Sequence, residues 1–211
     1  MTEEEKGLSP LQEFWYYFRQ NRGAVIGLIL IFIFAAVALL APWLAPYGEG
    51  EILPDAMSLP PVWSEGGRAG FWLGTDDIGR DLLSRLIYGA RVSMGIGFLV
   101  VTISASIGTA LGLLAGYVGG WLDRFLMRVC DVLLALPSIL LAIVVVSVLG
   151  PNLFNAIVAV SLVAIPNFIR LVRASVLAEK EKQYVTAART YGSGHFRLLV
   201  INIFPNCLAP L

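Results

Sequence analysis

Charged residues are missing from three long stretches of the chain. The stretches lie between Arg22 and Glu49, between Arg91 and Asp123, and between Asp131 and Arg170. A helix that crosses the ~30 Å hydrocarbon core of a bilayer needs about 20 apolar residues. The first two stretches each hold one such helix. The third holds two, separated by the turn sequence Gly150-Pro151-Asn152. We therefore predict four membrane helices, over residues 24–41, 94–118, 132–149 and 153–171.

The composition agrees with an all-α polytopic membrane protein. Hydrophobic residues make up 57% of the chain and charged residues 14%, and the mean hydropathy is +0.77. A typical soluble domain has about 45–50% apolar and about 25% charged residues. Because every backbone polar group must be paired inside lipid, helices are the natural spanning structure. The first apolar run is longer than the core of a cleavable signal peptide, so we expect it to be retained.

Lysine and arginine predict the orientation, because they are enriched in cytoplasmic loops. If the N-terminus is cytoplasmic, the outer loop holds only Arg68, Arg80, Arg85 and Arg91. The inner segments then hold the remaining basic residues: Lys6, Arg19, Arg22, Arg124, Arg128, Arg170, Arg173, Lys180, Lys182, Arg189 and Arg197. We therefore predict a cytoplasmic N-terminus and a cytoplasmic position for the polar segment that starts at Glu179.

These features divide the chain into segments. Residues 1–22 form a cytoplasmic interfacial segment, in which Phe14, Trp15 and Phe18 lie near basic residues that suit the membrane surface. Residues 23–42 form the first transmembrane helix. Residues 43–91 form an outer loop and an amphipathic helix, and 92–211 form the remaining membrane domain with its cytoplasmic loop 179–205.

Known catalytic and metal-binding patterns are missing from the sequence. It contains neither GxxxxGK[ST] nor HExxH, His195 is its only histidine, and the predicted spans hold no acidic residue. Cys130 and Cys207 suit neither a disulfide nor a thiolate metal site. We expect a protein that is not an enzyme, with no catalytic residues, no ATPase site, no metal, no cofactor and no nucleic-acid partner. An ion channel is disfavoured because no filter motif or pore-lining charge is present.

Small residues and prolines mark the predicted spans. A glycine recurs every fourth residue along the second span, on one helix face, and such a stripe lets a neighbouring backbone approach closely. The stripe consists of Gly108, Gly112, Gly116 and Gly120. Pro137 and Pro166 are candidates for kinks in the third and fourth spans, where a mobile transporter and a static membrane protein are both compatible with them.

The outer loop ends in the sequence LGTDDIGRDLLSRLIYGARVSMG. We predict an amphipathic helix capped by Thr75, with Asp76 and Asp77 in its first turn and an i, i+4 pair between Asp81 and Arg85. Ile78, Leu82 and Leu86 would form its apolar face. Such a helix could pack against the protein itself or contact an external partner.

The segment 179–205 predicts two short helices joined by a sharp turn. Strong helix formers run from Glu179 to Thr190, and Gly192 then ends the helix. Ser193 is the expected cap of the second helix, and Pro205 is its expected boundary. Small residues flanked by aromatic ones suit helix-in-groove docking, and an ordinary loop is the alternative.

This segment resembles the coupling loop of ABC-importer permeases, whose pattern is Glu-Ala-Ala, three residues, glycine, nine residues, aliphatic, any residue, leucine and proline. Thr186-Ala187-Ala188, Gly192 and Pro205 match its spacing, whereas Thr186, Asn202 and Phe204 depart from its residue types. The sequences LGTDDIGRDLLSRLIYGARVSMGIG and GYVGGWLDRFLMRVCDVLLALPSILLA are similar to the peptide and nickel branch of these permeases. The resemblance extends from LQEFWYYFRQNRGAV to the last residue.

The resemblance implies a type I transmembrane domain in the bacterial inner membrane and a larger complex around it. The expected partners are a second permease subunit, two ABC ATPase subunits, a periplasmic substrate-binding protein and the lipid bilayer. The residues implied to couple to the ATPase are Tyr184, Val185, Thr186, Ala187, Ala188, Arg189, Gly192 and Pro205. The periplasmic signature comprises Gly74, Thr75, Asp76, Gly79, Arg80, Asp81 and Arg85.

Two alternatives stay open from the sequence alone. The family has six spans and four are expected here, so we expect a truncated chain, which could be an inactive or regulatory membrane scaffold. The cargo is also open, because no span residue identifies a ligand. Di- or oligopeptides, nickel complexes and other small solutes all remain compatible with the sequence.

Overall fold

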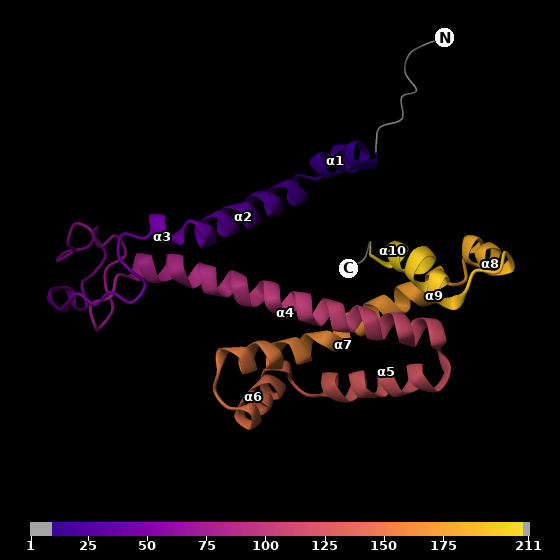
Figure 1. Ribbon diagram of the computed structural model, residues 1–211. Helices are drawn as coiled ribbons and strands as arrows, with labels where there is room; N and C mark the ends of the chain where they lie inside the picture. Colours follow the sequence, from indigo (N-terminus) through magenta and orange to yellow (C-terminus); the bar gives the residue numbers. More distant parts are fainter. Residues whose placement is uncertain (1–9, 209–211) are drawn as a thin grey trace, which may run out of the picture. The chain divides into compact units, whose positions relative to one another are not determined.

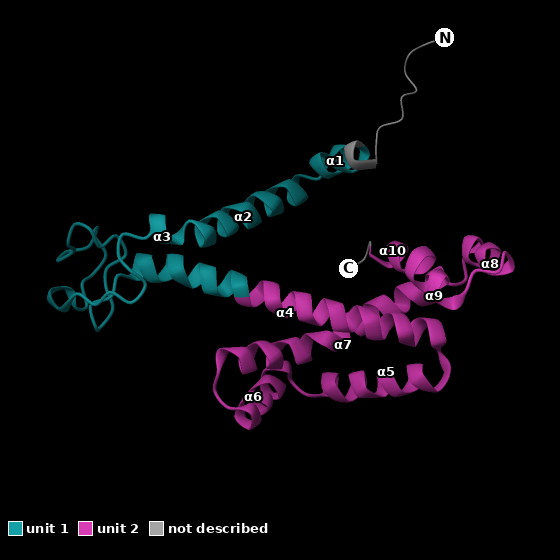
Figure 2. Ribbon diagram, viewed as in Figure 1, with its two compact units in different colours: residues 1–95 teal, residues 96–211 magenta. Residues whose placement is uncertain are grey.

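The computed structural model describes residues 10–208, with side chains from residue 13 onward (Figure 1). The described chain is helical and contains no strand. It divides into two compact units, residues 1–95 and 96–211, and the boundary falls inside the long helix α4, Leu82–Val118 (Figure 2). The first nine residues of the predicted interfacial segment, and residues 209–211, lie outside the described residues.

The first unit begins with two consecutive helices, α1 (Pro10–Gln20) and α2 (Arg22–Leu39). Asn21 separates them, and its side-chain oxygen accepts a hydrogen bond of 3.2 Å from the backbone N–H of Ala24, which caps α2. α2 is long and apolar enough to cross a membrane, which confirms the first predicted span within about two residues. A short helix, α3 (Ala41–Leu44), follows it.

The outer loop of the first unit is mostly irregular and contains one turn of 3₁₀ helix, η1 (Pro54–Ala56). The helix expected to start at Thr75 is wrong, because α4 begins only at Leu82. Residues 75–81 instead form a turn closed by a bridge between Thr75 and Asp81. From Leu82 the amphipathic segment and the second predicted span form one continuous helix.

The second unit adds α5 (Gly120–Ala135), α6 (Ser138–Leu149) and α7 (Leu153–Glu179). The predicted third span over 132–149 is not one straight helix, because it includes the end of α5 and all of α6, which meet at an angle of 96°. Pro137 causes the break: it has no N–H to donate, and Leu136 before it is extended, with ψ of 139°. Three described helices could each span a membrane, and the bent pair could supply a fourth span.

Pro166 lies inside α7, which is helical throughout its length. Asn152 caps this helix by accepting a hydrogen bond of 3.0 Å from the N–H of Phe154. After α7 come four short elements: α8 (Gln183–Thr190), α9 (His195–Arg197), the π-helix η2 (Leu198–Ile203) and α10 (Phe204–Cys207). They lie together at the end of the second unit (Figure 1).

The glycine stripe packs α4 closely against α7. A methyl group added at Gly112 would lie 2.8 Å from the carbonyl oxygen of Ile169, and one at Gly116 would lie 2.8 Å from Cβ of Val176. Gly108 faces Ile165 and Phe168 in the same way. Gly120 does not belong to this face: it starts α5 with φ of +63° and has no neighbour within 4 Å.

Candidate functional site

The predicted coupling segment is anchored by one buried side chain of α8. Val185 is fully buried and packs in a cluster with residues of α7, η2 and α10, namely Val172, Val176, Leu198, Ile203 and Cys207. Ala188, one helical turn later, packs partly against the same cluster. Thr186, Ala187 and Arg189 lie on the other side of α8 and are exposed. One face of α8 therefore holds it to the protein and the other is exposed.

The turn after α8 presents aromatic side chains outward. Gly192 has φ of +81°, a conformation that glycine adopts without steric cost, and it ends the helix as predicted. Tyr191 before it is 90% exposed, and Phe196 after it is 80% exposed. Two details of the prediction are wrong: Gly194, not Ser193, precedes α9, and Pro205 lies in the first turn of α10 rather than at a helix end.

Tyr184 lies at the centre of a polar network. Its hydroxyl donates to Oε2 of Glu179 at 2.6 Å and accepts from Nδ2 of Asn206 at 3.1 Å. Partial burial and the Glu179 carboxylate raise the pKa of Tyr184 to about 12, so the hydroxyl keeps its proton near neutral pH. No pattern in the sequence indicates this network, because Glu179 and Asn206 come close to Tyr184 only when α7, α8 and α10 fold together.

Basic residues and the histidine make further links near this segment. Nζ of Lys182 lies 2.6 Å from Oε1 of Glu179, and Nζ of Lys180 donates to the carbonyl of Gly116 at 3.1 Å, at the C-terminal end of α4. The hydroxyl of Tyr117 lies 2.7 Å from Nδ1 of His195. His195 therefore joins α9 to α4.

Two ion pairs join α5 to α7, and the sequence reasoning did not foresee them. Arg173 contacts both carboxylate oxygens of Asp123, the longer contact being 2.7 Å from Nη2 to Oδ2. Arg170 pairs with Asp131. In the sequence, Arg170 and Arg173 served only to predict the orientation, and Asp123 and Asp131 only marked the ends of uncharged stretches. Antiparallel packing of α5 and α7 brings them together.

The periplasmic signature forms a hydrogen-bonded turn centred on Asp76. Its carboxylate accepts from the backbone N–H of Arg80 at 2.9 Å and lies 2.8 Å from both Nε of Arg80 and Nη1 of Arg85. The backbone hydrogen bond from Arg80, reinforced by the Arg80 guanidinium, lowers the pKa of Asp76 to about 2. Arg85 therefore pairs with Asp76, and the predicted pair between Asp81 and Arg85 is wrong.

The other signature residues hold this turn against the rest of the outer loop. Asp81 is buried and caps α4, with Oδ2 accepting from the N–H of Ser84 at 2.7 Å. The hydroxyl of Thr75 donates to the carbonyl of Ala56 and accepts from the N–H of Leu59 at 2.9 Å. Gly74 and Gly79 have φ of +80° and +85° and pass directly beside the carbonyls of Leu59 and Leu53. A side chain at either glycine would collide with that backbone.

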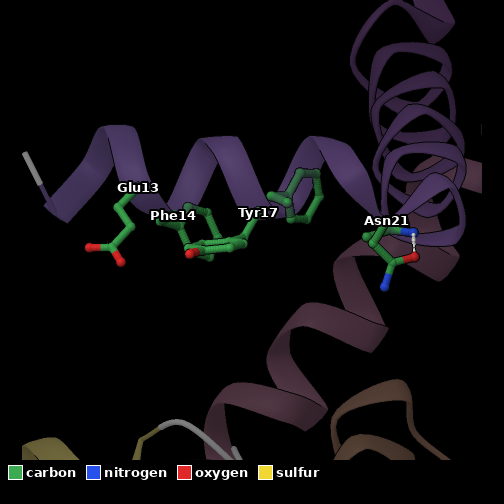
Figure 3. Close-up of a pocket in the computed structure, with 6 residues that line it drawn as sticks. Glu13, Phe14, Tyr17 and Asn21 are labelled. Atoms are coloured by element: carbon green, nitrogen blue, oxygen red, sulfur yellow. Dashed lines mark hydrogen bonds between the residues drawn. The ribbon is translucent and has the colours of Figure 1, made fainter. Parts of the chain in front are cut away.

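A concave surface lies where α1 meets α2 (Figure 3). It has a volume of about 490 Å³ and is lined by Glu13, Phe14, Tyr17, Phe18, Asn21 and Ala24. Phe14, Trp15, Tyr16 and Tyr17 of α1 are exposed, and the guanidinium of Arg19 lies 5.2 Å from the ring centre of Trp15. Since the single residue Asn21 separates α1 from a spanning helix, this aromatic and basic surface suits a membrane interface.

The described residues contain no group of three or more histidine, cysteine, aspartate or glutamate side chains that could hold a metal ion. Comparison with known proteins then decides the class of the molecule. Residues 108–211 match the model of the binding-protein-dependent transport system inner membrane component, and residues 9–61 match that of the N-terminal transmembrane domain of oligopeptide transport permease C.

The chain is 54% identical over 203 residues to the dipeptide transport system permease protein DppC of Haemophilus influenzae, covering 96% of this chain and 69% of that protein. It belongs to the family of binding-protein-dependent inner-membrane permeases. DppC of Escherichia coli K12 is also 54% identical, over 97% of this permease and 68% of the relative. The di/tripeptide transport system permease protein DppC of Pseudomonas aeruginosa is 49% identical, over 96% and 67%.

Family and fold together make this permease a multi-pass inner-membrane protein with the helical membrane domain of ABC importers, as the sequence predicted. Its relatives are membrane subunits of transporters, which agrees with the expectation of a subunit that is not an enzyme.

Proposed function

We propose that this permease is one of two membrane subunits of an ATP-driven importer of di- or oligopeptides, and that partner subunits hydrolyse the ATP. The observation that carries the proposal is 54% identity to two dipeptide permeases over nearly the whole chain. The names of all three relatives refer to peptides, which favours peptides over nickel or another small solute.

The elbow formed by α8, Gly192 and α9 is the proposed contact with the ATPase. Its anchored face carries Val185, and its outer face carries exposed small residues and the aromatic side chains of Tyr191 and Phe196. A helix with one anchored face and one exposed face can bind in a groove of a partner and still move as one body with α7. In this proposal the elbow is cytoplasmic, as the distribution of lysine and arginine predicts.

The outer loop is the proposed contact surface for a periplasmic substrate-binding protein. Ion pairs and buried backbone contacts hold its turn in one conformation, while Trp63 and Trp72 remain exposed, at 69% and 62%. Exposed aromatic side chains on a rigid loop are typical of protein interfaces. The aromatic surface of α1 is proposed to lie on the cytoplasmic membrane surface.

Co-purification with the two ATPase subunits tests the proposal. Deleting residues 185–192, or replacing the exposed Ala187 with Trp, should abolish recovery of the ATPases and of dipeptide uptake while the permease stays in the membrane fraction. Ala178→Trp is the matched control, because Ala178 is also exposed but lies in the last turn of α7 outside the elbow, and it should retain the ATPases. Normal uptake by the deletion variant would refute the coupling assignment.

A further inference from the structure

A single hydroxyl group connects four elements at the end of the second unit. Glu179 is the last residue of α7, Tyr184 lies in the first turn of α8, Asn202 is in η2 and Asn206 is in α10. The Tyr184 oxygen lies within 2.6 Å of Glu179, 3.1 Å of Asn206 and 3.2 Å of the Asn202 carbonyl. Loss of this one group would therefore loosen contacts of three elements with α8.

The arrangement of donors explains how the network is satisfied. A tyrosine hydroxyl has one proton to donate. Glu179 offers the shorter and charged acceptor, so it takes that proton. The Asn202 carbonyl is satisfied separately by Nδ2 of Asn206 at 2.8 Å, and the second oxygen of Glu179 is satisfied by Lys182. Each partner thus has a defined role, and the network has one arrangement.

The rest of α8 is weakly attached to the protein. Residues 180–182 alone connect it to α7, Val185 is its only buried side chain among the described residues, and Ala188 is partly buried. An apolar contact of one valine resists separation of the helices but has little directional preference. The hydrogen bond between Tyr184 and Glu179 supplies that direction, since charge-assisted hydrogen bonds are short and geometrically demanding.

We propose that Tyr184 and Glu179 form a clamp that makes α8 move as one body with α7, so that Tyr184 is a positioning residue for coupling and not a contact with the ATPase. The inference rests on the proposed function, since it assumes that α8 receives the ATPase. It revises the role that the family resemblance implies for Tyr184. The hydroxyl of this residue already donates to Glu179 at 2.6 Å, so its proton is engaged within the protein although the side chain is 38% exposed.

Tyr184→Phe removes the clamp without changing the proposed docking surface. The variant keeps the ring, the packing of Val185 and the exposed face of α8, and it removes only the hydroxyl. We expect that it still binds the ATPases and still supports ATP hydrolysis in the reconstituted four-subunit importer with its binding protein. Import of a radiolabelled dipeptide per ATP hydrolysed should fall at least about tenfold, the lower end of the range for a hydrogen bond to a charged group.

Two further variants separate the clamp from a general loss of structure. Ser175→Ala removes a hydroxyl whose bond, to the Leu171 carbonyl at 3.1 Å, stays within α7, and it should leave the import-to-hydrolysis ratio unchanged. Glu179→Gln keeps an acceptor oxygen for Tyr184. It should therefore lower the import-to-hydrolysis ratio less than Tyr184→Phe does. Backbone amides of α8 should exchange hydrogen faster in Tyr184→Phe, and those in the middle of α7 should not.

The outcomes are distinguishable. A wild-type import-to-hydrolysis ratio in Tyr184→Phe, or unchanged amide exchange in α8, would overturn the clamp. Loss of ATPase binding in Tyr184→Phe alone would also overturn it, because the hydroxyl would then act in docking. Failure of the wild-type permease to bind the ATPases would instead refute the proposed function.

Discussion

At the scale of single residues, Gly112 shows how one missing side chain determines the packing of two helices. Its Cα faces the backbone of α7 so closely that an added Cβ would lie 2.8 Å from both the Ile169 carbonyl oxygen and Cβ of Val172. Backbone atoms cannot move aside as the end of a flexible side chain can. The regular spacing of the glycines predicted this contact, but the spacing extended it wrongly to Gly120.

Gly112→Leu should therefore destabilise the permease by about 1–3 kcal/mol or more, because overpacking forces α4 away from α7. The loss should appear as a lower midpoint of thermal unfolding of the detergent-solubilised protein, followed by size-exclusion chromatography after heating. Gly97→Leu is the matched control on the same helix, since no atom lies within 4 Å of an added Cβ there. Equal midpoints for the two variants would contradict the packing role of the stripe.

The carboxylate of Asp76 predicts a pH dependence for the outer loop. Folding lowers its pKa from 3.8 to about 2, so its contribution to stability is complete above pH ~4 and is lost as the pH falls through about 2. Limited proteolysis with pepsin should cut the outer loop faster as the pH is lowered through this window. In the Asp76→Asn variant, pepsin should cut the outer loop readily throughout this pH range, with a weaker dependence on pH.

Asp77→Asn provides the comparison for this experiment. Asp77 is the next residue along, is exposed and makes no ion pair among the described residues. Its replacement should keep the wild-type pH profile of cleavage. A flat profile in the wild-type protein would show that Asp76 does not hold the turn.

At the scale of secondary-structure elements, the broken pair α5 and α6 departs most from the sequence prediction. Hydropathy placed one span over 132–149, whereas the chain bends at Leu136-Pro137 and α5 continues back to Gly120. Hydropathy reports which residues avoid water but not the direction of the backbone. Pro137 was a candidate kink from the sequence, but the sequence did not indicate that the chain turns by 96° there.

The two ion pairs between α5 and α7 should differ in strength. Asp123 and Arg173 are 16% and 29% exposed, whereas Asp131 and Arg170 are 53% and 46% exposed. Arg173→Gln should therefore cost about 1.5–3 kcal/mol, as for a hydrogen bond to a charged group. Arg170→Gln should cost about 0–1 kcal/mol, as for an exposed pair.

A double-mutant cycle on thermal stability, with Asp123→Asn as the second substitution, measures the coupling directly. The combined variant should lose much less than the sum of the single losses. Additive losses would mean that Asp123 and Arg173 act independently, and that this ion pair does not hold α5 to α7.

At the scale of the whole molecule, topology follows from a sum of many weak preferences. Basic residues cluster in segments that alternate with apolar spans, and their distribution predicts a cytoplasmic elbow and an external outer loop. No single residue determines this orientation, so it is best tested with two reporter positions expected on opposite sides of the membrane.

Tyr191→Cys and Trp63→Cys, each in a background with Cys130 and Cys207 replaced by alanine, serve as the reporters. Both native side chains are well exposed, at 90% and 69%. In intact spheroplasts a membrane-impermeant maleimide should label position 63 only. Position 191 should become reactive after the membrane is opened. Labelling of position 191 from the outside would invert the proposed topology and remove the basis for ATPase coupling.

The sequence by itself determined the class of the molecule, most of its span positions and the location of the elbow. These depend on quantities that are local along the chain, namely runs of apolar residues, the balance of basic residues and turn-forming glycines such as Gly192. The residues proposed to couple to the ATPase were implied by the resemblance of this segment to a family pattern of fixed spacing. None of these required knowledge of which elements meet in space.

Only the tertiary structure decided which polar groups pair. The partners of Tyr184, Arg173 and Arg85 became clear when helices and turns distant in sequence packed together, and the expected pair of Asp81 with Arg85 was replaced by Asp76 with Arg85. The direction of the chain at Pro137 and the exclusion of Gly120 from the stripe were decided in the same way. The physical reason is that a hydrogen bond or close contact depends on relative position in three dimensions, which residue type and spacing do not specify.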